Sequence, residues 1–246
     1  MNEMRYERQR KVIGLLGQAK LEKAAVCIIG CGGLGCPIAL YMVASGVGKI
    51  TLIDDDVVSL SNLHRQILFG EKDIGLSKVD AAKNSLLQLN SHVDVVTVKD
   101  RVTAVNVEEY IQGHDLIILG CDNLPTRYAV NDACCAMQTP FINASVLGDE
   151  GAITFFDIAN GCYRCLFPEL PPDHVIPSPD RMGVLGASVG VIGTAAATMA
   201  IEILAGQKAN YVNKMFVFDS LTLEMKSFLF SKGNHCNSCS SYHHNQ

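Results

Sequence analysis

The sequence predicts an α/β protein with a doubly wound, Rossmann-like and mostly parallel sheet, extended by antiparallel strands near the C-terminus. Apolar, strand-like runs alternate with helical patterns through most of the first 150 residues, which is typical of parallel sheets. A glycine-rich turn directly follows the first of these runs. The 246 residues are 48% hydrophobic and 18% charged, which suits a single domain with a sizeable buried core.

The first part of the chain divides into a helical arm over 1–22 and a nucleotide-binding part over 23–150. Gly46 and Gly48 predict a turn between the first crossover helix and the second strand. Ser77 is a suitable N-cap for a helix with apolar residues at helical spacing. The expected elements in order are a strand over 25–30, a helix over 34–45, a strand over 49–54, a helix over 77–90, strands over 93–98 and 115–120, a helix from about 125 to 137 and a strand over 140–145.

The rhythm changes in the second part, over 151–246. The runs "GAITFFD", "KMFVFD" and "EMKSFLF" are expected to be strands, with one long helix over 187–205 between the first two. The segment 168–183 is polar and rich in proline, and it is too long for a tight connection. We therefore expect it to be a mobile loop over the site.

One segment is long enough to be considered as a membrane span. Val184–Ile201 carries no charged residue, but it is rich in Gly, Ala, Ser and Thr rather than in Leu, Ile and Phe. Glu202 closes it without a basic flank, so a buried helix in the core or at a subunit interface is the preferred interpretation. The start "MNEMRYERQRK" lacks the apolar core of a signal peptide, which predicts a soluble, cytoplasmic protein.

Charge and aromatic content argue against a nucleic-acid partner. The net charge is −5, so there is no basic footprint for a phosphate backbone. Only 7% of the residues are aromatic and Trp is absent, which disfavours a stacking surface for single strands.

The stretch "VCIIGCGGLGCPI", residues 26–38, has the form of a nucleotide-binding turn. Gly30, Gly32 and Gly35 follow the G-x-G-x-x-G spacing between a strand and a helix, with Gly33 beside them. Glycines let the backbone approach a phosphate, whose charge then lies at a helix N-terminus. Asp54 ends the next strand, where an acidic residue can accept hydrogen bonds from a ribose. This motif alone fits an NAD(P)-dependent dehydrogenase, or a tight turn without a ligand.

Polar residues at the neighbouring strand ends favour phosphate chemistry instead. Asn62 and Arg65 lie just after the second strand, at the ligand edge of an open α/β sheet, and can donate to phosphate oxygens. Lys78 adds a cation at a helix start, and Asp122 is a carboxylate that could hold Mg²⁺. Together they resemble the equipment of a phosphoryl or nucleotidyl transferase, although taken singly each could be a solvated surface charge.

Two cysteine pairs are a second, independent signal. Cys162-x-x-Cys165 and Cys236-x-x-Cys239 match a tetrahedral structural zinc site, provided that the fold brings the two pairs together. Paired cysteines in a reducing compartment are more often ligands than disulfides. The alternative, a redox pair, is disfavoured because neither pair follows a thioredoxin-like strand.

An ordered set of motifs supports a family assignment. The segments "RYERQ", "GCGGLGCPIALYMVASGVGKITLIDDDVVSLSNLHRQILF", "DIGLSKVDAAK", "CDN", "GCYRCLFP" and "CNSC" follow one another along nearly the whole chain. This set resembles the ThiF/MoeB/HesA family, the bacterial relatives of ubiquitin-activating enzymes. The resemblance implies ATP-dependent adenylylation of the C-terminal Gly-Gly carboxylate of a ubiquitin-like sulfur carrier of the ThiS or MoaD kind, with release of pyrophosphate.

The resemblance also implies roles for individual positions. Asp54 would hold the ribose, Asp122 would bind Mg²⁺, and Arg8 would reach across a homodimer into the partner's site. The residues with implied catalytic roles are Arg8, Asn62, Arg65, Lys78 and Asp122. The residues implied to contact the nucleotide are Gly30, Gly32, Gly33, Gly35, Asp54, Asp56, Ser61, Asn62, Arg65, Gln66, Lys78, Cys121, Asp122 and Asn123.

The sequence departs from the family pattern in the loop before the long helix. Several family members carry a cysteine there that is thought to act covalently, but here the stretch holds Ser178, Pro179 and Asp180. Ala187 stands where a proline is common. Cys134 and Cys135 lie in a predicted helix and are expected to be core residues.

Three functions therefore agree with parts of the sequence. They are an adenylyltransferase in thiamine or molybdopterin biosynthesis, an NAD(P)-dependent oxidoreductase, and a non-catalytic relative that binds a ubiquitin-like protein. Arg8, Arg65, Lys78 and Asp122 together favour the first, since a scaffold would not need all four.

Overall fold

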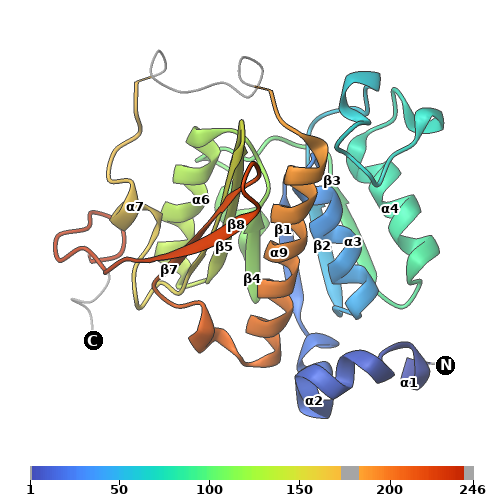
Figure 1. Cartoon of the computed structure of the whole chain (residues 1–246), viewed down its shortest axis with the longest axis horizontal. Coiled ribbons are helices and arrows are strands. Elements are labelled where there is room, and N and C mark those ends of the chain that lie inside the picture. The colour runs from blue at the N-terminus through green and yellow to red at the C-terminus, as the bar shows by residue number, and fades with distance from the viewer. Residues whose placement is uncertain (1, 173–182, 241–246) are drawn as a thin grey trace.

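One eight-stranded sheet forms the centre of the molecule in the computed structural model, which describes residues 2–172 and 183–240 (Figure 1). The strand order is β3-β2-β1-β4-β5-β6-β7-β8. The five strands from β3 to β5 are parallel, and β6 to β8 continue the sheet in antiparallel fashion, which confirms the predicted fold class. The strands are β1 Ala25–Ile29, β2 Lys49–Ile53, β3 Asp94–Val98, β4 Leu116–Leu119, β5 Phe141–Leu147, β6 Glu150–Phe156, β7 Lys214–Asp219 and β8 Glu224–Leu229.

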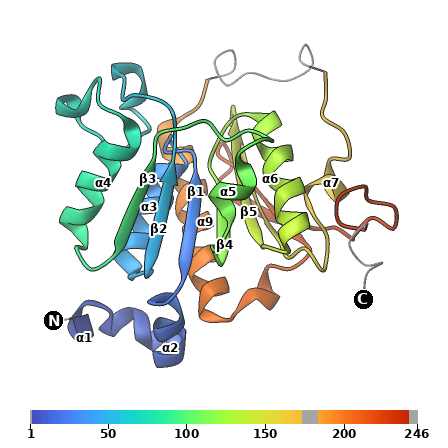
Figure 2. The same ribbon diagram turned by 180° about the vertical axis from the view of Figure 1, so that it is seen from behind.

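Helices cover both faces of the sheet. Figure 1 shows α3, α4 and α9 on one face, and the view from behind in Figure 2 shows α5 and α6 on the other. The helices are α1 Asn2–Arg5, α2 Glu7–Leu21, α3 Gly35–Ser45, α4 Lys78–Leu89, α5 Val107–Ile111, α6 Leu124–Met137, α7 Tyr163–Leu166 and α9 Gly186–Ala205. Because both faces are covered, the central strands are continuous apolar runs rather than alternating ones.

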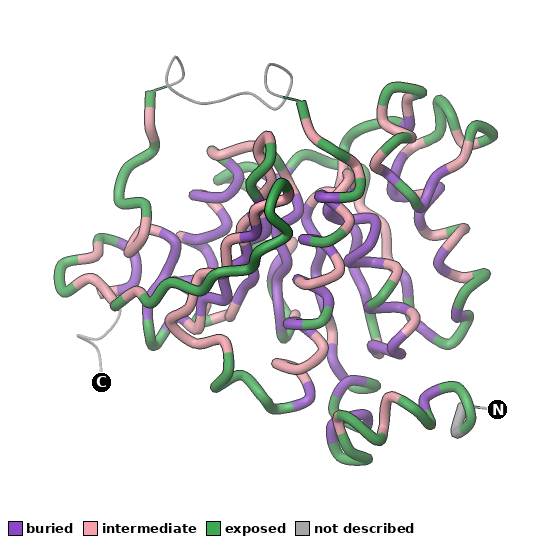
Figure 3. Tube along the Cα trace, viewed as in Figure 1, coloured by how far each residue is buried: buried purple, intermediate pink, exposed green. Residues whose placement is uncertain are grey.

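Alternate residues of each central strand enter two separate cores. Ile28 of β1 points into the larger core beneath α3 and α9, whereas Cys27 and Ile29 point into the smaller core beneath α6. Cys134 and Cys135 of α6 are fully buried in this smaller core, as predicted. The coloured trace in Figure 3 shows this burial concentrated in the strands and the inner faces of the helices, while β8 is exposed along its whole length.

Helix α9 is long and apolar enough to cross a membrane by length and composition alone. In this structure it packs against α3 and the strands β5 and β6, and its inner residues belong to the larger core. Gly193 permits the contact with α3, because a Cβ at this position would collide with Pro37. The prediction of a buried core helix is therefore confirmed.

The elements that the sequence did not predict are short. Helices α5 and α7 contain five and four residues. The predicted mobile loop over 168–183 lies mostly outside the described residues, as do Ser178, Pro179 and Asp180.

Candidate active site

A cavity of about 470 Å³ opens at the carboxyl ends of β1, β2 and β4. This edge is where open α/β sheets bind their ligands. Its wall combines the glycine turn after β1, the polar segment after β2 and the start of α6. The predicted residues that line it are Gly30, Gly32, Gly33, Asp54, Asp56, Asn62, Arg65, Gln66, Lys78, Cys121, Asp122 and Asn123.

Three predicted residues do not line this cavity. Gly35 lies behind the turn, where a Cβ would collide with the carbonyl oxygen of Gly30. Ser61 faces Ser59, with their hydroxyl oxygens 3.0 Å apart, and only its backbone carbonyl approaches Arg65. Arg8 is exposed on α2, the helix that leads into the amino end of β1 and thus lies at the opposite end of the sheet (Figure 1).

The turn after β1 leaves open space beside its backbone. Gly30 has φ 96°, a left-handed conformation that favours glycine. A Cβ at Gly32 would meet only the side-chain amide of Gln66, at 3.8 Å, so this position can face a bound group. The backbone N–H of Cys31 donates to Asp54 Oδ2 at 2.7 Å, which fixes the turn against the end of β2.

Lys78 and two aspartates form a charged cluster on the cavity wall. Lys78 is only 5% exposed, and its Nζ lies 2.7 Å from Asp56 and 3.9 Å from Asp54. Burial raises the pKa of Asp54, while Lys78 and the backbone N–H groups of Cys31 and Asp56 act against that rise. The cluster thus holds a fixed ammonium group beside the turn, where it can meet an anionic ligand.

Arg65 is a second cation on the cavity wall, and its side chain lies against Gly33 of the turn. Its Nη1 donates to the carbonyl of Ser61 at 3.2 Å and lies 2.8 Å from the His64 ring. Neither contact neutralises its charge with a carboxylate. The guanidinium therefore keeps donors that a phosphate could accept.

The start of α6 contributes Asp122, Asn123 and a residue that sequence reasoning missed. Asn123 caps the helix by accepting from the N–H of Thr126 at 3.0 Å. Arg127, one turn further, is only 6% exposed and lines the cavity. Its Nη2 donates to the carbonyls of Cys121 at 2.6 Å and Ala144 at 3.4 Å, whereas its Nε has no hydrogen-bond partner in the part of the chain that the structure describes.

Arg127 is thus a buried cation that no carboxylate neutralises within the described residues. Such groups are costly unless they are paired, so the cavity is suited to an anion. The signal that could have revealed this residue is a single arginine one turn after "CDN", in a helix whose next residues are largely apolar.

Acidic residues near the cavity are partly engaged by cations. Asp54, Asp55 and Asp56 place carboxylate oxygens within 4.8 Å of one another, the spacing of a metal cluster. However, Lys78 approaches Asp54 and Asp56, and Arg101 donates to Asp55 at 3.0 Å. Asp122 lines the cavity but is outside this group.

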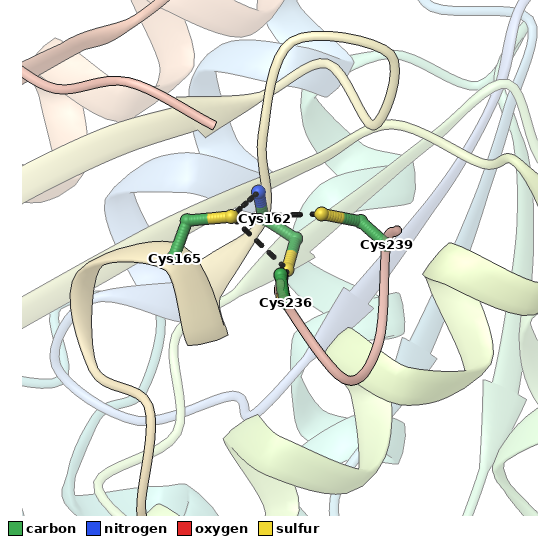
Figure 4. Close-up of side chains that lie close together, drawn as sticks. All are labelled: Cys162, Cys165, Cys236 and Cys239. Carbon is green, nitrogen blue, oxygen red and sulfur yellow. Dashed lines mark hydrogen bonds between the residues drawn. The ribbon is translucent and has the colours of Figure 1, made fainter. Parts of the chain in front are cut away.

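The two cysteine pairs come together, one at the start of α7 and the other in the segment after β8, as Figure 4 shows. Their sulfur atoms are 3.9 Å apart for Cys162–Cys165, and 3.5 Å apart for both Cys162–Cys236 and Cys165–Cys239. A tetrahedral zinc site with Zn–S bonds of about 2.3 Å has S–S edges of about 3.8 Å. The four residues can therefore hold zinc, as the sequence predicted.

The surroundings of this cluster favour the thiolate at Cys162, whereas burial raises the pKa of Cys165 and of Cys239. The backbone N–H groups of Cys162 and Gly233 lie 3.5 and 3.3 Å from Cys165 Sγ. Hydrogen bonds from Cys135 and the neighbouring thiols lower the pKa of Cys162 to about 5, against the effect of burial. Thiolate is the form that binds zinc.

Comparison with known proteins identifies the family of this chain. The sequence profile of the ThiF family matches residues 6–240. The chain belongs to the ThiF family. The protein named adenylyltransferase and sulfurtransferase MOCS3 from Xenopus laevis is 42% identical over 241 residues, covering 96% of this chain and 53% of the relative. The Mus musculus protein of the same name is 43% identical over 221 residues, covering 89% and 48%.

This ThiF-family chain therefore spans about half the length of the curated relatives it matches. Among solved structures, E. coli MccB with ATP superposes with a TM-score of 0.84 at 27% identity, covering 96% of this chain and 74% of that one. E. coli MccB with MccA-N7isoASN gives a TM-score of 0.86 at 25% identity, covering 98% and 75%.

Proposed function

We propose that this chain is an adenylyltransferase that uses ATP to activate the C-terminal Gly-Gly carboxylate of a ubiquitin-like sulfur carrier. The observation that carries the proposal is the cavity itself, where a glycine turn open to a ligand faces Arg65, Lys78 and Arg127. The ThiF-family match, the relatives named adenylyltransferases and the MccB structure with ATP support it.

The carboxylate oxygen would attack the α-phosphorus of ATP, and the bond to pyrophosphate would break, leaving an acyl-adenylate. Asp54 would accept hydrogen bonds from the ribose, and the backbone at Gly32 and Gly33 would approach the phosphates. Arg65 and Lys78, with Asn62, would stabilise the charge that moves onto the leaving pyrophosphate. Positioning and electrostatics of this kind supply most of the catalysis in phosphate chemistry.

Asp122 is the residue we propose to hold Mg²⁺, which would neutralise phosphate charge when bound. Arg127 would add a fixed positive charge at the start of α6. It is anchored to the carbonyls of Cys121 and Ala144, so its position is set before any substrate arrives. Preorganised charge of this kind is worth more than charge that must move into place.

The oxidoreductase alternative fits this cavity less well. A nicotinamide ring needs an apolar slot. The cavity has apolar residues such as Leu34 and Val189, but Arg65, Lys78 and Arg127 share its wall and are better suited to phosphates.

We place the carrier on the 151–246 part of the chain. Its β7–β8 hairpin exposes apolar side chains such as Leu221, Leu223 and Phe228, and β8 is an edge strand of the sheet among the described residues. Exposed apolar patches and open edges are sites of protein association.

A homodimer is the second part of the proposal. Val12, Leu15 and Leu16 of α2 are more than 70% exposed, an unusual state for large apolar side chains. Arg8 lies on the same helix, away from the cavity of its own chain. We infer that it serves the cavity of the partner subunit.

The proposed setting is cytoplasmic thiamine or molybdopterin biosynthesis. Because the loop holds Ser178 rather than the family cysteine, the adenylate would receive sulfur from another protein or pass to a different acceptor. We place no nucleic acid or membrane among the partners.

The test is ATP–pyrophosphate exchange with a purified Gly-Gly-tailed carrier of the ThiS or MoaD kind. We expect exchange that depends on the carrier and is lost when its last glycine is removed. Arg65→Ala should reduce kcat far more than ATP affinity, because its contact matters most in the transition state. Wild-type exchange in Arg65→Ala would remove that residue's role. Binding of NADH without any exchange would favour the oxidoreductase.

A further inference from the structure

A single carboxylate joins the two halves of the cysteine cluster. Arg164 lies between Cys162 and Cys165, and it holds Asp132 of α6 through two parallel contacts, Nε–Oδ1 at 2.8 Å and Nη2–Oδ2 at 2.7 Å. Ser238 lies between Cys236 and Cys239, and its hydroxyl donates to the same Asp132 Oδ1 at 2.5 Å. One residue from each C-x-x-C loop thus contacts the same side chain, that of Asp132, which lies outside both loops.

Neighbouring contacts fix the geometry of this junction. Asn131 donates from Nδ2 to Asp132 Oδ1 at 2.9 Å, and its own Oδ1 accepts from the backbone N–H of Tyr163 at 2.8 Å. The guanidinium of Arg164 also stacks 4.6 Å above the ring of Tyr128, one turn earlier in α6. Two-pronged arginine–carboxylate pairs are directional, so they hold the loop in one orientation.

The junction acts on two short chain segments that the sheet has already brought close. Cys162 and Cys236 are 74 residues apart, but the antiparallel strands β6 to β8 and the contact of Phe230 with Phe156 close most of that loop, so the entropy left to be lost is that of ordering the two C-x-x-C loops. In a site where only the metal joins the two pairs, metal binding must supply that free energy. Here α6 already holds one residue from each loop.

We propose that Asp132 is the positioning residue of the metal site, holding both cysteine pairs face to face before a metal binds. Metal affinity then depends on a carboxylate that touches no metal. Groups that orient metal ligands typically change affinity by about 10–100-fold when they are removed.

The probe is Zn²⁺, and the readout is its affinity and its rate of release from the full chain to a chromogenic chelator. We expect Asp132→Asn to weaken Zn²⁺ binding about 10-fold or more, with faster release. Glu224→Gln is the matched control, because Glu224 forms an exposed ion pair with Lys226 at 2.8 Å in β8 and touches neither loop. Zinc affinity equal to wild type in Asp132→Asn would overturn the proposal.

A cycle of variants separates positioning from general destabilisation. No hydrogen bond or ion pair joins Arg164 to Ser238 within the described residues, but both contact Asp132, and their loops also meet through the cysteine sulfurs. Coupling between Arg164→Lys and Ser238→Ala in zinc affinity is therefore assigned to Asp132 where it disappears in the Asp132→Asn background. We expect non-additive losses that become additive in the Asp132→Asn background. Additive losses in the wild-type background would contradict the proposal, and this part of the test stands even if Asp132→Asn fails to fold.

Hydrogen exchange of the metal-free chain gives a readout without any metal. We expect residues 231–240 to stay protected in metal-free wild type and to lose protection in metal-free Ser238→Ala. Equal exchange in these two metal-free proteins would show that the junction does not hold the pairs together.

Discussion

Lys78 shows most clearly how a single side chain ties the fold to the proposed chemistry. It is nearly buried, and a buried ammonium group is tolerated only with charged partners. Those partners, Asp54 and Asp56, themselves lie on the cavity wall. The same charge that stabilises the end of β2 is thus available to a phosphate.

Replacing Lys78 by methionine tests this double role. We expect Lys78→Met to lose ATP–pyrophosphate exchange and to lower the free energy of unfolding by about 1–3 kcal/mol, because the buried carboxylate of Asp54 loses its cation. Urea unfolding followed by circular dichroism measures the second effect. Lys99→Met is the control, since Lys99 pairs with Asp80 at an exposed site where a salt bridge is worth about 1 kcal/mol or less. Equal losses of stability in both variants would refute the argument.

The proposed contact between Asp54 and a ribose should make nucleotide binding sensitive to acid. Burial raises its pKa, so it takes up a proton at a higher pH than an exposed aspartate does. Because the folded-state pKa lies above the unfolded value, this group contributes stability below the unfolded pKa, and the contribution is lost as the pH rises through the folded pKa. Nucleotide affinity should depend on pH in the opposite direction and increase as Asp54 ionises, since the ionised carboxylate is the stronger acceptor for a ribose hydroxyl.

We therefore expect ATP affinity to fall as the pH drops through the raised pKa of Asp54. Fluorescence titration with a labelled ATP analogue across the acid range measures this limb. Asp54→Asn should bind ATP more weakly at neutral pH, and its ATP affinity should not fall further as the pH drops. If ATP affinity falls with pH in Asp54→Asn as it does in wild type, the fall is caused by another group.

The turn between β1 and α3 contains two glycines that are needed for different reasons. Gly35 and Gly32 belong to the same motif, yet they serve different purposes. Gly35 permits the backbone to pack against Gly30, whereas Gly32 leaves room on the cavity side.

Alanine substitutions should separate these two purposes. Gly35→Ala should prevent correct folding of the turn, because its Cβ would collide with the carbonyl of Gly30. Gly32→Ala should keep the melting temperature close to wild type but weaken ATP binding. Gly190→Ala in α9 is the control, since no atom lies within 4 Å of the Cβ that it adds. Calorimetry for stability and for ATP binding measures both effects, and a stable Gly35→Ala with wild-type affinity would contradict this division.

The elements that the sequence predicted are longer than those that it missed, and they have a clear pattern of apolar residues. Strands β1, β2 and β4 are largely apolar runs with a glycine next to one end, so they were found within a residue or two of their ends. Helices α5 and α7 are too short to show helical periodicity.

The same contrast holds for the site. Spacing alone indicated that Cys162 and Cys236 belong together, and motif order placed Arg65 and Lys78 at one edge. The burial of Arg127 and the convergence of Arg164 and Ser238 on Asp132 depend on tertiary contacts that leave no periodic signal in the chain.

At the scale of the whole molecule, the position of Arg8 bears on the oligomeric state. Helix α2 lies at the amino ends of the parallel strands, and the cavity lies at their carboxyl ends. A catalytic role for Arg8 therefore requires a second copy of the chain, and the exposed apolar residues of α2 are suited to such a contact.

Mixing two inactive variants tests this arrangement. If Arg8 acts across the dimer, Arg8→Ala and Arg65→Ala are each impaired, but a mixed dimer has one site with both arginines intact. Equal mixing with free subunit exchange gives about one quarter of all sites in that state. We expect pyrophosphate exchange to recover toward that fraction, with no recovery when the two substitutions are combined in one chain and mixed with either single variant. Recovery that never exceeds the average of the two separate variants would mean that Arg8 does not act on the partner's cavity.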